Sequence, residues 1–186
     1  MSTGEQQESL ITPEMKALIG KETESRTAAD EVTVSEIRRF AQATFDENPL
    51  YYDADYASST KFGGLVGPGP FTTHMPGRRP FGDPDLMLDP TWDGETYPPK
   101  PGEAPARIQW PDGYYNLHGA DELEIHQLAR PGERISSKRR IVDIYDREGR
   151  SGRLGLTITE TVFTNEKGEV LAINRNTMVA RKNPTS

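Results

Sequence analysis

The chain has 186 residues, a net charge of −7 and no cysteine, and 33 % of its residues are hydrophobic. This length suits one domain with a single core, and the low hydrophobic content indicates either much irregular chain or a core that a partner subunit completes. The negative charge argues against a nucleic-acid partner, and the lack of cysteine excludes disulfides and cysteine-ligated metals.

No apolar run is long enough to span a bilayer, and the first twenty residues do not resemble a signal peptide, so we predict a cytoplasmic protein with no membrane association. Residues 1–9 are polar and are predicted to form a disordered tail, as are residues 183–186. The sequence between them, 10–182, is predicted to be a single domain. The basic cluster 138–140 is predicted to be a solvated strand face.

Two helices are predicted near the N-terminus. Apolar residues at helical spacing predict the first over residues 10–22, ending at Gly20. The second begins at Thr33, which forms a capping box with Glu36. It must end near Phe45, because Pro49 disfavours helical geometry at the residue before it.

The C-terminal third alternates apolar and polar residues, as half-buried strands do. Strands are predicted over 133–145, 154–162 and 170–180, with a hairpin turn over 164–169. These strands exceed the usual five or six residues. We therefore expect a twisted antiparallel sheet that curls around another part of the molecule.

Eleven of the fifteen prolines fall between residues 68 and 111, together with both tryptophans. The segment 76–113 is predicted to be a long, ordered loop, because disordered linkers are poor in aromatic residues. Just before it, Pro70 and Pro76 bracket a helix of about six residues, or roughly 9 Å. Such a short helix leaves part of the sheet uncovered. Either that space is open to an acyl chain or a partner, or the proline-rich loop fills it.

The stretch "EVTVSEIRRFAQATFDENPLYYDADYA" (31–57) resembles the hydratase motif of MaoC-like acyl dehydratases. The segments 117–135 and 142–181 look like the N-terminal type of that domain, also called the fatty-acid-synthase-like dehydratase domain. The resemblance extends from about Ile19 to Arg181. It implies an α+β, hot-dog fold in which a long curled antiparallel sheet surrounds a short, truncated central helix, with the long proline-rich loop as an addition.

The resemblance implies reversible hydration of a 2-enoyl thioester of coenzyme A or an acyl-carrier protein, without a cofactor. Asp46 falls on the catalytic aspartate of the motif and Asn48 on its asparagine, but Tyr51 replaces the motif histidine and Phe45 the glycine. A tyrosine with a pKa of about 10 is a poor proton acceptor, although it can donate a hydrogen bond. Either Tyr51 assists Asp46, or His118 does, or this chain has lost catalysis.

The resemblance also implies that a backbone N–H at the start of the central helix stabilises the thioester oxygen. Pro68 and Pro70 have no N–H. The candidate donors are therefore Gly67, Gly69, Phe71 and Thr72. No histidine has a second ligand at a suitable spacing, so no metal site is predicted.

Three functions stay open at this point. The chain is an enoyl-thioester hydratase or 3-hydroxyacyl dehydratase, working as a homodimer or in a heteromer with another MaoC-type subunit. Alternatively it is a non-catalytic partner that shapes the substrate tunnel of a catalytic subunit, or, less in keeping with the motif, a hot-dog thioesterase. Acyl length, the thioester carrier and the direction of the reaction are not encoded in these motifs.

Overall fold

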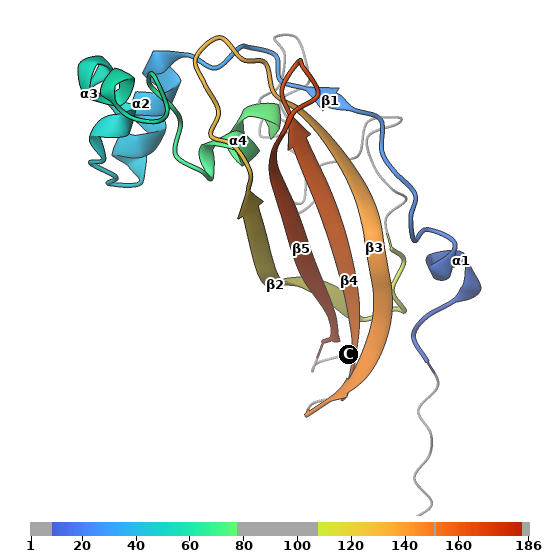
Figure 1. The fold of residues 1–186 in the computed structure, drawn as a ribbon. Coiled ribbons are helices and arrows are strands. Elements are labelled where there is room, and N and C mark those ends of the chain that lie inside the picture. The colour runs from blue at the N-terminus through green and yellow to red at the C-terminus, as the bar shows by residue number, and fades with distance from the viewer. Residues whose placement is uncertain (1–8, 78–107, 151, 184–186) are drawn as a thin grey trace, which may run out of the picture.

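A computed structural model describes residues 9–77, 108–150 and 152–183 (Figure 1). Most of the proline-rich loop expected over 76–113 lies outside these residues, as do 1–8 and 184–186 of the expected tails. No helix in the described part of the chain is long and apolar enough to cross a membrane. The helices are α1 (Pro13–Lys16), α2 (Val34–Ala43), α3 (Ala54–Ser59) and α4 (Phe71–His74), with 3₁₀ turns η1 (Pro49–Tyr51) and η2 (Met75–Gly77).

The strands form one antiparallel sheet in the order β1-β3-β4-β5-β2. They are β1 (Arg26–Thr27), β2 (Tyr114–Ile125), β3 (Ser136–Gly149), β4 (Gly152–Thr164) and β5 (Val170–Lys182). The last three follow one another as hairpins, which confirms the predicted meander. Figure 1 shows that they bend along their length, as expected for a curled sheet.

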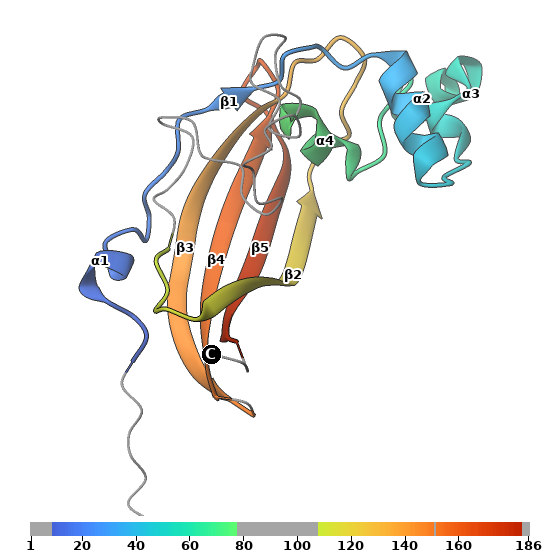
Figure 2. The same ribbon diagram turned by 180° about the vertical axis from the view of Figure 1, so that it is seen from behind.

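Strand β2 was not predicted from the sequence. It pairs with β5 over nearly its whole length and forms one edge of the sheet (Figure 2). Polar residues occupy both of its faces, for example His118 on one and Glu122 on the other, so no two-residue alternation marks it. Of its twelve residues only Tyr114 and Leu123 are even partly buried in the isolated chain.

One face of the sheet, here called the inner face, packs against α4. Phe163 of β4 and Ala172 of β5 lie on it and share a buried cluster with Phe71 and Met75. Further along the same face a second cluster joins Ile141 and Ile144 of β3 to Met15 of α1 and to Trp110.

The helices agree with prediction in part: α2 is as predicted, α1 and α4 are shorter, and α3 was not predicted. Helix α2 starts with the predicted capping box and ends two residues before Phe45. Helix α1 spans only four residues of the predicted 10–22, because Met15 is its one buried side chain and short helices need tertiary packing to persist. Helix α4 has four residues instead of about six, and it starts at Phe71 with Pro70 as its N-cap.

The carboxylate of Asp146 on β3 forms an ion pair with Arg153 on β4 and accepts hydrogen bonds from the N-terminal segment, so stability depends on pH. Arg153, 2.8 Å from Asp146, lowers the pKa of Asp146 to about 2, and Ser9 and the Leu10 N–H donate to the same carboxylate. A carboxyl group with a lowered pKa stabilises the fold above its unfolded pKa, and that stability is lost as the pH falls.

We therefore expect the wild type to lose about 2 kcal/mol of unfolding free energy through this group between about pH 5 and pH 2. Asp146→Asn should lack this component in denaturant titrations at a series of pH values. Asp143→Asn, on the same strand but without an arginine partner among the described residues, is the control. An unchanged pH profile in Asp146→Asn would contradict the assignment.

Candidate active site

The end of helix α2 positions the carboxylate of Asp46. The Asp46 N–H donates to the Ala41 carbonyl at 2.9 Å and the Phe45 N–H to the Gln42 carbonyl at 3.2 Å. These two bonds form a Schellman motif, in which the residue after the C-cap takes the left-handed conformation. Phe45 occupies that position with φ 55°. The motif therefore turns the chain sharply, and Asp46 leaves the helix in a defined direction.

A series of short polar contacts then holds the turn after Asp46. Its Oδ1 accepts the Asn48 N–H at 3.1 Å, and the Asn48 Oδ1 accepts the Leu50 N–H at 3.1 Å. The Tyr52 hydroxyl donates to the Asp46 carbonyl oxygen at 2.9 Å. The sequence gives no sign of this role for Tyr52, because a contact between residues six positions apart leaves no periodic pattern. Asp46 itself is half-buried.

Phe45 is a strained position, because a bulky residue in the left-handed region costs roughly 1–2 kcal/mol. The ring gains little in return, since Phe45 is 91 % exposed. We expect Phe45→Gly to raise the unfolding free energy by about 1 kcal/mol in a denaturant titration. Phe45→Ala, which removes the ring but keeps Cβ, should gain much less. Equal effects of the two changes would show that backbone strain is not the cause.

Tyr51, which stands where the motif has histidine, lies against Asp46 and Asn48. It is 8 % exposed and belongs to the main core cluster. Burial raises the pKa of its phenol, and the Asp46 charge raises it further, while a hydrogen bond with the Asn48 side chain acts in the opposite direction. The phenol therefore stays protonated near neutral pH and acts as a hydrogen-bond donor, not as a base.

The backbone at the start of α4 offers fewer donors than its sequence indicates. The Gly67 N–H donates to the Ala129 carbonyl at 2.8 Å, and the Phe71 N–H donates to the Pro68 carbonyl at 2.9 Å. No carbonyl in the described part of the chain accepts from the N–H of Gly69 or Thr72. Of these two residues, Gly69 is half-buried and Thr72 is fully buried.

The side-chain hydroxyl of Thr72 is a further polar group at the start of α4 that the sequence did not single out. The residue is fully buried, and its hydroxyl oxygen has no hydrogen-bond partner among the described residues. An unsatisfied buried polar group costs about 1–3 kcal/mol and is rare in native structures. Sequence offers no signal for it, because only the packing around α4 decides whether the hydroxyl finds a partner.

The turn after α2 and the start of α4 belong to one packed unit. The Val66 N–H donates to the Leu50 carbonyl at 3.4 Å. Tyr51, Val66 and Phe71 lie in the same core cluster. The candidate acid and the candidate oxyanion donors therefore come from two segments that are packed against each other.

His118 lies elsewhere. It is on β2, seven residues before Ile125, and a Cβ placed on Gly69 would lie 3.1 Å from the Ile125 side chain. Seven strand residues correspond to about 23 Å. His118 instead contacts Asp121 through Nε2 at 2.6 Å. The structure therefore groups Asp46, Asn48 and Tyr51 but does not bring His118 to the start of α4.

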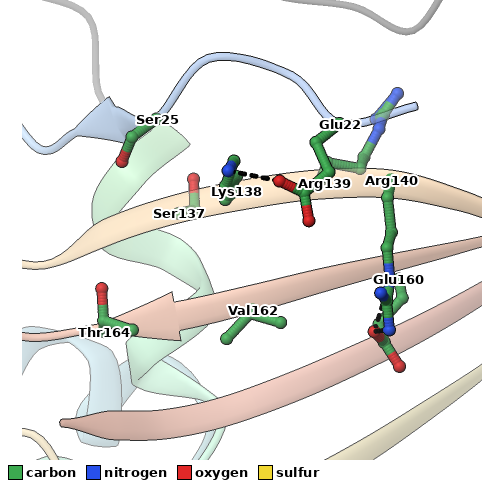
Figure 3. A pocket seen from close by; sticks show the side chains of 9 residues that line it. All are labelled: Glu22, Ser25, Ser137, Lys138, Arg139, Arg140, Glu160, Val162 and Thr164. Carbon is green, nitrogen blue, oxygen red and sulfur yellow. Dashed lines mark hydrogen bonds and ion pairs between the residues drawn. The ribbon is translucent and has the colours of Figure 1, made fainter. Parts of the chain in front are cut away.

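Two hollows formed by described residues are not lined by the predicted site residues. One, of about 480 Å³, is next to Phe45 and Tyr52. The other, of about 350 Å³, borders β3 and β4 (Figure 3). Two of its three cations are paired, Lys138 with Glu22 and Arg140 with Glu160 at 2.6 Å. Arg139 also lines this hollow, so its lining has one more positive than negative charge.

Comparisons with known proteins identify the family and the fold of the chain. The model of the family described as "FAS1-like, dehydratase domain region" matches residues 17–174. A UPF0336 protein of Parafrankia sp. (strain EAN1pec) is 28 % identical over 150 residues, which cover 78 % of this chain and 80 % of the relative.

Solved structures share the fold at lower identity. The ChsH1-ChsH2 complex from Mycobacterium tuberculosis matches with a TM-score of 0.69 and 18 % identity, covering 89 % of this chain and 86 % of that chain. A MaoC-like dehydratase from Rhodospirillum rubrum matches with a TM-score of 0.57 and 20 % identity, covering 89 % and 94 %. The curled five-stranded sheet and the few helices are those of a hot-dog fold, as predicted. The chain belongs to the family of the FAS1-like dehydratase domain region, whose model matches most of its length.

Proposed function

We propose that this chain is a subunit of an enoyl-thioester hydratase or 3-hydroxyacyl dehydratase. The observation that supports it most is the turn after α2, which fixes Asp46 beside the protonated phenol of Tyr51. A hydro-lyase of this kind needs a carboxylate to handle a proton and a donor to orient the water. Both groups are present, and both are held by contacts within the chain.

In the hydration direction, Asp46 accepts a proton from water while the water oxygen forms a bond to C3 of the enoyl group. The C2–C3 π electrons move toward the thioester, whose oxygen becomes negative. The N–H groups of Gly69 and Thr72 stabilise that oxygen. Asp46 then returns the proton to C2, so the net change is the addition of one water molecule. Dehydration follows the same steps in reverse.

A second candidate, the non-catalytic partner subunit, is favoured by one observation. Tyr51 has a raised pKa and cannot share proton transfer as a histidine would. In that case the turn after α2 only shapes the substrate tunnel of a subunit that has both acid and histidine.

In either case we propose that the chain works in a dimer or heteromer joined along β2. Among the strands that the structure describes, β2 is at the edge of the sheet, and it has the exposed side chains of Tyr115, Leu117 and Ile125. Free edges of this length are usually blocked by charge, proline or a covering element. The heteromeric ChsH1-ChsH2 complex has a related fold.

The test is an assay of the purified chain with crotonyl-CoA and with longer 2-enoyl-CoA substrates, following loss of the conjugated thioester. Turnover by the chain alone supports the catalytic proposal. Turnover only after addition of a MaoC-type subunit with both aspartate and histidine supports the partner role. Release of free coenzyme A without a hydroxyacyl product would overturn both.

A further inference from the structure

Two hydrogen bonds restrict the backbone on either side of Asp46. A residue has two soft backbone dihedrals, and these two angles set the direction of its Cβ. The peptide before Asp46 is held by the Asp46 N–H, which donates to the Ala41 carbonyl at 2.9 Å. The peptide after Asp46 is held by its carbonyl oxygen, which accepts from the Tyr52 hydroxyl at 2.9 Å. In the described part of the chain Tyr52 is the one donor to this oxygen, so the orientation of that peptide depends on a single hydroxyl group.

The turn after Asp46 explains how a side chain six residues away reaches this oxygen. Asn48 caps the 3₁₀ turn η1, and Pro49 at its start has a backbone angle fixed near the helical value. The N–H groups of Tyr52 and Asp53 both donate to the Pro49 carbonyl, at 3.2 and 2.9 Å. The chain therefore reverses between residues 46 and 52, and the Tyr52 side chain lies back along the turn with its hydroxyl at the peptide after Asp46.

Packing holds the Tyr52 ring only in part. Tyr52 is 38 % exposed, and a hollow of about 480 Å³ lies beside it. The neighbouring Tyr51 is 8 % exposed and belongs to the main core cluster, so its ring is held by packing. Tyr52→Phe would keep the ring but lose the bond, and the ring would then have room to turn into the hollow.

We infer that Tyr52 is a positioning residue for hydration, because its hydroxyl holds the peptide after Asp46 and thereby aims the Asp46 carboxylate at the reacting water. This inference rests on the proposed function, in which Asp46 is the base. A misplacement of about 1 Å can lower a rate by about a hundredfold. Because the Asn48 N–H still donates to the Asp46 Oδ1 at 3.1 Å, we expect a smaller loss without the hydroxyl, of about tenfold.

The experiment compares hydration of crotonyl-CoA by the wild type and Tyr52→Phe, with the purified chain or, if only the complex is active, with the complex. In Tyr52→Phe we expect kcat to fall about tenfold with KM unchanged, because the lost bond orients the base and does not bind the thioester. Tyr56→Phe is the matched control and should keep both parameters. Tyr56 is 46 % exposed, and its hydroxyl has no hydrogen-bond partner among the described residues. Circular dichroism and thermal melts establish that each variant is folded.

A double-mutant cycle shows whether Tyr52 acts through Asp46. Asp46→Asn removes the carboxylate, so adding Tyr52→Phe to it should cause no further loss in kcat, measured at a higher protein concentration. A merely structural role of Tyr52 would lower the rate by the same factor in both backgrounds.

The outcomes separate this inference from the function beneath it. An unchanged kcat in folded Tyr52→Phe, an equal loss in Tyr56→Phe, or an equal loss in the Asp46→Asn background would overturn the role of Tyr52 and leave Asp46 as the base. Full activity of folded Asp46→Asn, or no hydration by the chain or its complex, would overturn the proposed function, and the role of Tyr52 with it.

Discussion

Replacing Asp46 with asparagine is expected to lower the hydration rate of 2-enoyl-CoA by at least about a hundredfold, as measured by kcat/KM. General acid–base groups contribute about 10²–10⁴ to a rate, and an amide cannot take the proton of the water. The fold should survive, because the Schellman bonds use the backbone and the asparagine Oδ1 can still accept the Asn48 N–H.

Asp53→Asn is the matched control for this change. Asp53 lies seven residues after Asp46 and also accepts one backbone N–H, that of Tyr56 at 2.9 Å, as the N-cap of α3. Asparagine caps a helix as well as aspartate does, so activity and stability should both be close to wild type. If the chain is active and folded Asp46→Asn keeps full activity, Asp46 is not the base.

Leu117→Lys is expected to weaken subunit association by about thirtyfold or more, the effect of losing an interface contact worth about 2 kcal/mol. Leu117 is 41 % exposed in the isolated chain, so lysine there costs the monomer little. In a paired edge the ammonium group would lose its hydration, which costs free energy that leucine does not lose. Light scattering coupled to gel filtration, or sedimentation at several concentrations, measures the dissociation constant.

The control is Val142→Lys on β3. Val142 is 39 % exposed, but β3 lies near the other side of the sheet, away from the β2 edge. Val142→Lys should associate as the wild type does. If the complex is heteromeric, both variants are measured with the complementary subunit present. Equal dissociation in both variants, or none in Leu117→Lys, would locate the interface elsewhere.

The parts of the fold that sequence predicts well are those with local signals. The capping box at Thr33 and Glu36 marks the start of α2, and alternating residues mark β3, β4 and β5. Strand β2 escapes prediction because most of its side chains are polar and exposed on both faces, and only Leu123 and Ile125 at its end lie against the core. A strand at an exposed edge needs no periodic pattern, since its place is decided by the backbone of β5.

For the candidate site, too, the local features were predicted from the sequence and the long-range contacts were not. The motif after α2 singles out Asp46, Asn48 and Tyr51, and the structure places them together in one turn. The sequence could not tell that the N–H of Gly67 is used by Ala129, because that contact joins segments 62 residues apart. It also gave no reason to separate His118 from the others.

Sequence alone determined the local features of this protein: where α2 starts and ends, how the meander runs, and which turn holds the acid. These depend on neighbours within a few residues, whose hydrogen bonds and periodicity are visible in the chain. Only the tertiary structure decided that β2 is at the edge of the described sheet and that the buried hydroxyl of Thr72 has no partner among the described residues. The physical reason is that burial and hydrogen-bond satisfaction depend on residues from distant segments.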